Sequence, residues 1–398
     1  MSKSPFKICF LADSHGLFDD RIYWKEALSL HKHGYEVHYI LAGDENESGV
    51  TPDGIHYYKL KKEKYITNRY LNYLLKRLLP GGFYGNMLKR AEAISADVYH
   101  IHDLKVNRIG KSLKGLPHKP KVVYDIHEPY PENIIDYFSG PDILKPFIKW
   151  YSGYIRVWEK NCARAYDLII TTEENMQQRF KNYFPEKPVE IIYNYTNLPL
   201  TSTNQEYDEK TYDAIYTGGI TKRRGAMKIL QAVRTLKKDH PAFNMLFLGT
   251  WFPADLKNEM QEFVVKNKLE KNVEMIDSVP FNEVTEYYLK SRIGLGIFLP
   301  IPTHRIILQI KIFEYMNFGL PIVGSNFGHI AKIINKHHCG ITVDPDDPES
   351  IANAFNTLLT NRELLDRLSS NGIKAARKYY RWDKMEEKLV SIYRKLLD

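Results

Sequence analysis

One lysine and one glutamate stand three residues apart in a stretch that pairs a helical pattern with a short apolar strand, QIKIFEYMNFGLPIVGSN (309–326). Residues at i and i+3 are neighbours on a helix, so the plain interpretation of Lys311 and Glu314 is a surface ion pair, which contributes only a few tenths of a kcal/mol. Lysine before glutamate is the less favourable order for such a pair. The alternative gives each group its own ligand: the Lys311 ammonium binds phosphate oxygens, and the two Glu314 oxygens accept hydrogen bonds from the vicinal hydroxyls of a ribose.

A glycine-rich turn with three basic residues precedes this stretch, GITKRRG (219–225). Glycines at a strand end let the backbone approach an anion, and the helix that follows offers unpaired N–H groups and a positive dipole end. Lys222, Arg223 and Arg224 add charge suited to a phosphate or diphosphate. The spacing is neither GxGxxG nor a P-loop, so neither dinucleotide redox chemistry nor ATP hydrolysis is indicated. A plain strand–helix turn with exposed basic residues is the alternative.

Histidines and acids follow several expected strands in the N-terminal half. Ligands of open α/β sheets lie at the carboxyl ends of the strands, so residues just after each strand are the candidates. They are Gly16, Asp20 and Arg21 after the first strand, His102 and Asp103 in HIHD, and His127, Glu128 and Glu132 in DIHEPYPE. A lone histidine is usually structural, but two histidine–acid pairs at one sheet edge favour a site.

No metal site is expected from these residues. His100, His102 and His127 lack the spacing of a motif such as HExxH. The acids of 344–347, DPDD, precede a helical pattern, which is typical of a turn and N-cap. A G-x-S-x-G elbow and the kinase loop set are both missing from the sequence, which gives no support to a serine hydrolase or a kinase.

The elements that position these residues alternate between strand-like and helix-like segments. This pattern predicts parallel sheets covered on both faces. A polar stretch at 197–213 interrupts it, so we expect two Rossmann-like domains facing one another across a cleft, 1–198 and 199–398. The tail from Pro348 is helical, and its last helix, at about 382–397, is free to pack back on either domain, the N-terminal one included.

Composition and charge narrow the classes of protein. The 398 residues are 43% hydrophobic and 26% charged, which is typical of a globular chain. Three cysteines far apart predict no disulfide framework and fit a reducing compartment. The N-terminus reads as a first strand rather than a signal peptide, and no segment approaches the roughly 20 apolar residues of a spanning helix. We therefore expect a cytoplasmic chain that is soluble or at most membrane-associated.

A net charge of +8 suggests an anionic partner. Nine basic residues and one acid, Glu63, lie between Lys59 and Arg90, interleaved with aromatic residues. An anionic membrane surface is one partner that residues 59–90 would suit, and a solvated helical face is the plain alternative. Nucleic acid is not expected, because no helix-turn-helix, RNP-like or zinc-finger pattern accompanies the charge.

Taken in order, these segments resemble the retaining, GT-B fold glycosyltransferases of family four, which use nucleotide-sugar donors to build bacterial polysaccharides and glycolipids. The resemblance runs over nearly the whole chain. It rests on FDDRIYWKEALSLHKHGYEV, DVYHIHD, VVYDIHE, YTGGITKRRG, KIFEYMNFGLPIVGS, CGITVDPDDPESI and YYRWDKMEEKLVSIY. Each motif alone is weak, and their order makes the resemblance specific.

The resemblance implies a residue for each part of the reaction. Gly219, Arg224 and Lys311 would bind the donor diphosphate, Glu314 the ribose hydroxyls, and His127, as the catalytic candidate, the transferred sugar. Further contacts with donor or acceptor would come from Gly16, His102, Glu128, His304 and Arg305. The acceptor would be a hydroxyl of a glycan or lipid-linked molecule bound by the N-terminal domain, in surface polysaccharide synthesis such as capsule or lipopolysaccharide. No cofactor, metal or protein nucleophile is implied.

Two departures from the family keep other functions open. Many relatives carry Glu-x7-Glu, and eight residues before Glu314 this chain has Ile306. An arginine that often follows the first glycine of the turn is here Gly219. Sugar recognition would then rest on backbone groups or on His304 or Arg305. The alternatives are a GT-B-type nucleotide-sugar 2-epimerase and a non-catalytic GT-B-shaped partner protein.

Overall fold

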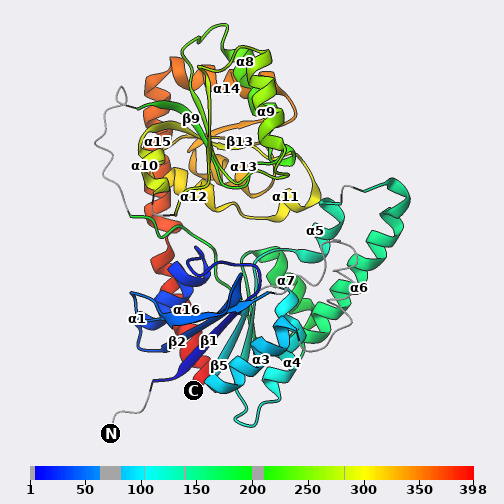
Figure 1. The fold of residues 1–398 in the computed structure, drawn as a ribbon. Coiled ribbons are helices and arrows are strands. Elements are labelled where there is room, and N and C mark those ends of the chain that lie inside the picture. The colour runs from blue at the N-terminus through cyan, green and yellow to red at the C-terminus, as the bar shows by residue number, and fades with distance from the viewer. Residues whose placement is uncertain (1–4, 63–81, 103, 139, 200–209, 282) are drawn as a thin grey trace. The chain divides into compact units, whose positions relative to one another are not determined.

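Two compact units make up the chain (Figure 1). The structure, a computed structural model, describes residues 5–62, 82–102, 104–138, 140–199, 210–281 and 283–398. The N-terminal unit comprises Met1–Asn194 and Trp382–Asp398, and the C-terminal unit comprises Tyr195–Arg381. Each unit holds one predominantly parallel sheet between helices, as the strand–helix alternation predicts.

The sheet of the N-terminal unit has eight strands in the order β3-β4-β2-β1-β5-β6-β7-β8. All of its pairings are parallel except β3 with β4. The central strands are apolar runs buried on both faces, as strands covered by helices must be. The strands are β1 (Lys7–Ala12), β2 (Glu36–Gly43), β3 (Glu47–Val50), β4 (His56–Lys61), β5 (Val98–His102), β6 (Lys121–Ile126), β7 (Leu168–Thr171) and β8 (Val189–Ile191).

Helices cover both faces of this sheet and enclose two separate cores. One face carries α3 (Phe83–Ile94), η2 (Leu104–Val106), α4 (Asn107–Lys114), α6 (Lys145–Ala163) and α7 (Glu174–Tyr183). The other carries the π-helical η1 (Ile22–Ala27), α1 (Leu28–Lys32) and α16 (Trp382–Leu397). Two short segments, α5 (Tyr130–Asp136) and η3 (Asp142–Leu144), lead into α6.

The last helix belongs to the N-terminal unit, although the rest of the C-terminal half does not. Trp382 Nε1 donates a hydrogen bond to Ser29 Oγ at 2.9 Å, and the Tyr393 hydroxyl lies 2.6 Å from His100 Nδ1. The chain first passes between the units at 194/195 rather than at the expected 198/199. The reason is that the Tyr195 ring packs against Phe313, at 4.9 Å between ring centroids, within the C-terminal unit.

The sheet of the C-terminal unit has six parallel strands in the order β11-β10-β9-β12-β13-β14. They are β9 (Tyr212–Thr217), β10 (Met245–Gly249), β11 (Val273–Asp277), β12 (Ser291–Gly296), β13 (Ile322–Ser325) and β14 (Gly340–Val343). The helices are η5 (Lys222–Arg224), α8 (Ala226–Leu236), α9 (Leu256–Lys266), α10 (Val284–Leu289), α11 (Pro302–Ile306), α12 (Ile310–Asn317), α13 (Gly328–His337), α14 (Pro348–Thr360) and α15 (Arg362–Tyr379).

Local signals in this unit act as the sequence predicts. Helix α12 stops before Gly319, whose φ of +68° suits a residue without a side chain. The Asp347 side chain accepts from the Glu349 N–H at 3.0 Å, so the acids of 344–347 do form a turn and N-cap for α14.

The basic range 59–90 lies partly outside the described residues, which omit 63–81. Of its ends, Lys59 is on strand β4 and pairs with Glu47 at 2.7 Å, whereas Arg90 is on α3 over the Tyr58 ring. In the described ranges, no helix is both long enough and apolar enough to cross a membrane. A membrane contact through 59–90 stays a prediction.

Candidate functional site

The turn that follows β9 brings backbone close to the centre of the C-terminal sheet edge. Gly218 has a φ of +92°, and a side chain at Gly249, on the neighbouring strand β10, would collide with the Gly218 carbonyl oxygen. Thr221 Oγ1 accepts from the Arg224 N–H at 3.0 Å and shapes η5, and Gly225, with a φ of +73°, begins α8. The predicted glycine-basic turn is therefore a tight strand–helix connection whose glycines are needed for its shape.

Lys311 extends from α12 to this turn. The residue is 7% exposed, and its Nζ has no hydrogen-bond acceptor among the residues that the structure describes. The ammonium lies 3.5 Å from the centre of the Tyr216 ring and 5.4 Å from that of Phe298. A methyl group at Gly218 would be 3.9 Å from Nζ, so the ammonium faces the glycine turn.

Burial lowers the pKa of Lys311 well below its usual range, and the positive charge of Arg224 lowers it further, while Glu314 opposes the shift. Two aromatic faces attract a cation but cannot replace the acceptors that water provides. Among the described residues, Lys311 Nζ therefore lacks the acceptors that its charged form requires.

Glu314, one turn further along α12, is 8% exposed and faces a different partner. Its Oε2 accepts a hydrogen bond from the buried Tyr288 hydroxyl at 2.6 Å. Tyr288 is also 3.1 Å from Thr217 Oγ1 at the end of β9, and its pKa is raised well above the usual range by burial and by the Glu314 charge. The tyrosine therefore remains a donor and fixes the carboxylate. The interpretation of Lys311 and Glu314 as a solvated ion pair is wrong, because both are buried and each has its own neighbours.

Arg224 is the second cation beside the turn. Its Nη1 lies 3.4 Å from the Gly219 carbonyl oxygen, and its guanidinium is 5.9 Å from the Phe298 ring centre. Lys222, by contrast, is exposed and pairs with Glu259 at 2.7 Å. Arg224 and Lys311 thus both contact the Phe298 ring, beside the N-terminus of the 11-residue helix α8, which has no side-chain cap. Two cations beside a helix N-terminus are an arrangement suited to a doubly charged anion.

The residues before α12 take different positions. His304 is 4% exposed, and its Nδ1 donates to the Leu299 carbonyl at 2.8 Å, which ties α11 to the loop after β12. Arg305 is exposed, with its guanidinium over the Phe327 ring. Ile306 ends α11 and is half-buried. Of the two residues named for sugar recognition, Arg305 is the more exposed.

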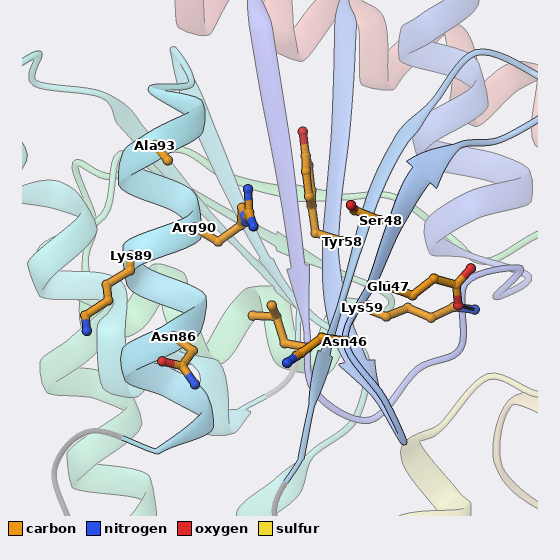
Figure 2. A pocket seen from close by; sticks show the side chains of 10 residues that line it. Asn46, Glu47, Ser48, Tyr58, Lys59, Asn86, Lys89, Arg90 and Ala93 are labelled. Carbon is orange, nitrogen blue, oxygen red and sulfur yellow. Dashed lines mark hydrogen bonds and ion pairs between the residues drawn. The ribbon is translucent and has the colours of Figure 1, made fainter.

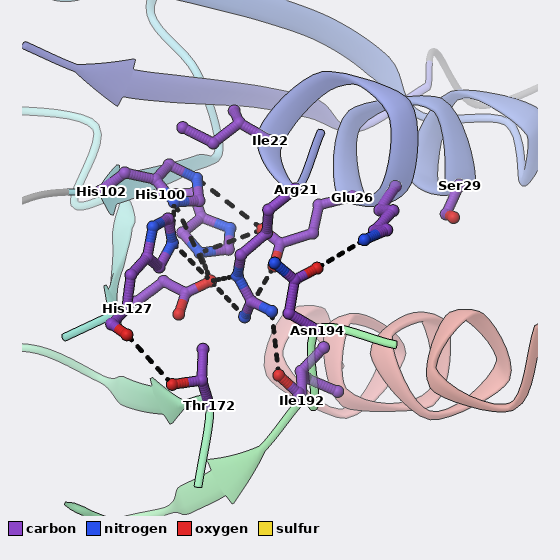
Figure 3. A network of polar contacts seen from close by, with 12 residues as sticks. Arg21, Ile22, Glu26, Ser29, His100, His102, His127, Thr172, Ile192 and Asn194 are labelled. Carbon is purple, nitrogen blue, oxygen red and sulfur yellow. Dashed lines mark hydrogen bonds and ion pairs between the residues drawn. The ribbon is translucent and has the colours of Figure 1, made fainter. Parts of the chain in front are cut away.

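A buried cluster of charged residues lies under the carboxyl ends of β5 and β6 in the N-terminal unit (Figure 3). The Arg21 Nη2 donates to Asp125 Oδ2 at 2.8 Å and is 2.9 Å from Glu26 Oε1, while Nη1 donates to the Ile192 carbonyl at 2.9 Å. Asp125 and Glu26 are fully buried. The guanidinium thus joins η1, β6 and the segment after β8.

Three histidines complete this cluster, and one of them reaches its surface. His100 and His102 are fully buried and stack at 4.4 Å between ring centroids. His102 Nδ1 lies 3.0 Å from His127 Nε2, whose side chain is 11% exposed. Burial lowers the pKa of both His100 and His102, so both are neutral near pH 7. The structure brings the predicted His102 and His127 together, with His127 outermost.

The pKa values of the two carboxylic acids of the cluster shift in opposite directions. Arg21 and the neighbouring histidines hold the pKa of Asp125 well below its usual range against its burial, whereas burial raises that of Glu26 well above it. Oxygen and nitrogen atoms of Glu26, His100, His102 and Asp125 lie within 4.8 Å of one another, close enough for a metal ion. However, the Arg21 guanidinium already provides the positive charge that both carboxyl groups contact, which argues for an internal ion pair rather than a metal centre.

Three further predicted residues of this unit are Gly16, Glu128 and Asp103. Gly16 is exposed with open space where a side chain would begin, and its carbonyl accepts from the Tyr39 hydroxyl at 3.3 Å. Glu128 is exposed and accepts from Asn133 Nδ2 at 2.7 Å, so it orders the start of α5. Asp103 lies outside the described residues.

Two neighbours of His127 were not among the predicted residues. The His15 ring stands edge-on to His127 at 5.4 Å, and Asp125 lies 3.5 Å from His127 Nε2. Asp125 precedes His127 by two residues, so the period of a strand already places the two on one face. The serine–histidine–glycine turn that contains His15 carried no comparable signal.

A pocket of about 650 Å³ lies elsewhere in this unit, between the β3–β4 edge and α3 (Figure 2). It is lined by polar and basic residues, among them Asn46, Lys59, Asn86, Lys89 and Arg90. None of its lining residues belongs to the histidine cluster, and the Arg90 guanidinium is stacked over Tyr58 at 4.9 Å.

Comparisons with known proteins cover both units. Two family models match: Glycosyltransferase Family 4 over residues 24–198 and Glycosyl transferases group 1 over residues 201–375. The chain is 27% identical over 254 residues to Spore coat protein SA of Bacillus subtilis, a match covering 59% of this chain and 66% of that relative, just under two thirds of its length.

Among the solved structures that match over almost their whole length, two illustrate the likeness. One is sucrose-phosphate synthase from Thermosynechococcus elongatus, with a TM-score of 0.74 and 15% identity, covering 98% of this chain and 99% of that one. The other is Anabaena HepE in complex with UDP-glucose, with a TM-score of 0.70, 15% identity and the same coverage. At this identity the likeness establishes the GT-B fold. With two family models that together take in residues of both units, the chain belongs to the group 1/family 4 glycosyltransferases, a retaining family of GT-B fold that uses nucleotide-sugar donors.

Proposed function

We propose that this chain transfers a sugar from a nucleoside-diphosphate sugar to a hydroxyl of a glycan or lipid-linked acceptor, in bacterial surface polysaccharide synthesis such as capsule or lipopolysaccharide. The observation that carries the proposal is the buried Lys311 side chain, which lies next to the glycine turn and Arg224 and finds no hydrogen-bond acceptor in the described part of the chain. A folded chain retains such a group at a cost to stability, which a bound anion removes.

The donor diphosphate lies between Lys311, Arg224 and the N-terminus of α8 in this proposal, with Gly219 giving it backbone access. Negative charge develops on the departing diphosphate as the bond to the sugar breaks. Fixed positive groups in a site shielded from water stabilise that charge more than the ground state, which lowers the barrier. The anomeric carbon gains oxocarbenium character, and the acceptor hydroxyl attacks from the face that the diphosphate leaves. The departing phosphate oxygen takes the hydroxyl proton.

Glu314 accepts the ribose hydroxyls in this scheme. Tyr288 occupies one side of its Oε2 and holds the carboxyl group in place, which reduces the entropy lost on binding. Lys311 and Glu314 are on successive turns of one rigid helix, so the phosphate and ribose contacts are held at a fixed spacing.

We propose His127 as the residue of the N-terminal unit that contacts the transferred sugar, with Gly16 leaving room beside it. The ring of His102 orients that of His127 through the 3.0 Å contact, and Asp125 lies behind both. Arg305, which is exposed, replaces the acid missing at Ile306 as a sugar contact. His304 supports it by fixing α11.

In this proposal the reaction takes place on the cytoplasmic side of the cell membrane. The three cysteines, Cys9, Cys162 and Cys339, are free and buried, which suits a reducing compartment. The chain matches a part of Spore coat protein SA rather than its whole length, so the acceptor and pathway are part of the proposal.

A panel of nucleoside-diphosphate sugars tests the function. Thermal shift identifies the donor, and incubation without acceptor then distinguishes a transferase, which hydrolyses it slowly, from a 2-epimerase, which converts the sugar. A protein that binds no member of the panel supports the non-catalytic alternative. In the transferase case, Arg224→Ala and Lys311→Ala each reduce turnover, and Lys222→Ala, at an exposed lysine of the same turn, is the matched control.

A further inference from the structure

Large apolar side chains exposed to solvent gather on one short part of the N-terminal unit. Among the large apolar residues that the structure describes between 135 and 157, the most exposed are Ile143 at 85%, Trp150 at 64%, Val157 at 59% and Phe147 at 58%. Ile135, Tyr137, Leu144 and Tyr154 in the same segment are exposed by 38% to 45%. Isolated apolar residues are normal on a protein surface, but a contiguous group marks an interaction surface.

The helical period explains why these side chains are exposed together. Phe147, Trp150, Tyr154 and Val157 recur every three or four residues and so form one stripe along α6. Ring centroids along it are 5.6 Å apart for Phe147 and Trp150 and 6.2 Å apart for Trp150 and Tyr154. A stripe at this spacing would ordinarily face a core.

A different face of α6 makes the packing contact with the unit. Ser152, Ile155, Glu159, Cys162 and Ala163 are the buried residues of the helix, and Ser152 Oγ donates to the Pro131 carbonyl at 2.6 Å. In Figure 1, α6 lies at the margin of the N-terminal unit with α5 beside its first turns. The apolar stripe is therefore an addition to the core-packing face and not part of it.

The charges of α6 indicate what would cover the stripe. Its exposed charged side chains are all basic, Lys145, Lys149 and Arg156, and its one acid, Glu159, is buried. Lys145 pairs with Asp142 at 2.8 Å and Arg156 with Glu132 at 3.0 Å. Lysine and arginine opposite an apolar face with tryptophan are typical of a helix that lies in a membrane interface. Protein–protein interfaces, by contrast, are depleted of lysine. Aliphatic side chains as exposed as Ile143 and Val157 offer no ring for stacking on a glycan.

We propose that the surface formed by Ile143, Phe147, Trp150, Tyr154 and Val157 docks on a lipid bilayer that contains anionic lipid. The apolar side chains enter the boundary between headgroups and acyl chains, and the lysines and arginine remain in the headgroup layer. The inference is independent of the donor site, since it uses none of the residues there. It adds α6 to the range 59–90, where a membrane contact stays a prediction.

Vesicle flotation tests the proposal with the full chain. Wild-type protein is expected to float with vesicles of phosphatidylglycerol and phosphatidylcholine and to bind pure phosphatidylcholine less. Phe147→Ser/Trp150→Ser/Val157→Ser is expected to weaken binding at least about tenfold, since three large side chains no longer leave water. The control Phe252→Ser/Val265→Ser removes apolar side chains of similar exposure, 67% and 62%, from the C-terminal unit and should bind as wild type.

Tryptophan fluorescence locates the contact without removing it. Trp150 is the one exposed tryptophan of the five, so a blue shift on vesicle addition should disappear in Trp150→Phe while flotation persists. Lys89→Glu/Arg90→Glu examines the basic region instead. The proposal is overturned if this variant loses binding while the α6 triple variant keeps it, or if Trp150→Phe retains the blue shift. It is equally overturned if wild type binds no vesicle. A wild-type dimer that binds no vesicle and that the triple substitution converts to a monomer would show that a second copy of the chain covers this surface instead.

Discussion

The ammonium of Lys311 lies 3.5 Å from the centre of the Tyr216 ring, and no acceptor among the described residues takes a hydrogen bond from it. A cation–aromatic contact offsets only part of the cost of removing an ammonium from water. We therefore expect Lys311 to lower the stability of the free protein while it strengthens donor binding, and both effects can be measured.

Lys311→Met should stabilise the free protein and weaken donor binding together. Methionine has a similar length and no charge to desolvate, so we expect a gain of about 1 kcal/mol or more in unfolding free energy. Affinity for a nucleoside diphosphate should fall at least about tenfold, because a charge-assisted contact is lost. Thermal unfolding and calorimetric titration measure the two effects. Lys332→Met, at an exposed lysine on α13, should change neither. Loss of stability in Lys311→Met would contradict the account.

Donor affinity should fall as pH rises through the lowered pKa of Lys311. A bound diphosphate favours the charged amine and raises its pKa, so binding takes up a proton between the pKa values of the free and bound protein. In the free protein, the stability of the fold changes with pH in the opposite direction to that expected for a lysine in an ion pair. Between the lowered folded pKa and the unfolded pKa of about 10.4, the unfolded lysine binds more protons than the folded one, so the unfolding free energy rises with pH. Calorimetry in two buffers of different ionisation enthalpy detects the uptake, which Lys311→Met should lack. Equal apparent enthalpies for wild type would contradict it.

Glu314→Gln should weaken binding of the nucleoside rather than of the phosphates. An amide presents one acceptor oxygen where a carboxylate has two, and the charge-assisted hydrogen bonds are lost. We expect a loss of about tenfold or more for a nucleoside diphosphate and almost none for its 2′,3′-dideoxy analogue. Tyr288→Phe, which removes the donor 2.6 Å from Oε2, should show a smaller loss of the same selectivity. Equal losses for both ligands in Glu314→Gln would exclude the ribose assignment.

Asp125→Asn and Glu26→Gln should differ, although both acids contact Arg21 and both are fully buried. Asp125 is ionised, so removal of its charge leaves Arg21 uncompensated and should cost about 3–5 kcal/mol. Burial raises the pKa of Glu26 well above its usual range and favours its neutral form, so the amide in Glu26→Gln is close to isosteric and should cost about 1 kcal/mol or less. Chemical unfolding of both variants measures this. Equal destabilisation would show that the charges are assigned wrongly.

Unfolding at low pH measures the contribution of the Arg21–Asp125 ion pair independently. Because the folded pKa of Asp125 is lowered, its stabilising contribution is present above the unfolded value of about 3.9 and is lost as pH falls toward the folded one. Asp125→Asn should therefore flatten the loss of stability below about pH 4.

The sequence predicts the two parallel sheets and the helix with Lys311 and Glu314 because local patterns determine these features. The sequence could not predict that Lys311 and Glu314 are buried. Residues 311–317 are all buried, and a helix that is covered on every side shows no amphipathic stripe. The Arg21–Asp125 contact joins residues 104 positions apart, a distance over which no spacing rule applies. The exposed stripe of α6 was missed for the opposite reason, because apolar residues at helical spacing usually indicate a core.

Direct titration of a nucleoside diphosphate into four proteins tests the central claim, that Lys311 and Arg224 form the donor site. Wild type and Lys222→Ala should bind alike, whereas Lys311→Met and Arg224→Ala should each bind at least about tenfold more weakly. If all four proteins bind a nucleoside diphosphate with the same affinity, the donor is held elsewhere and the account is wrong.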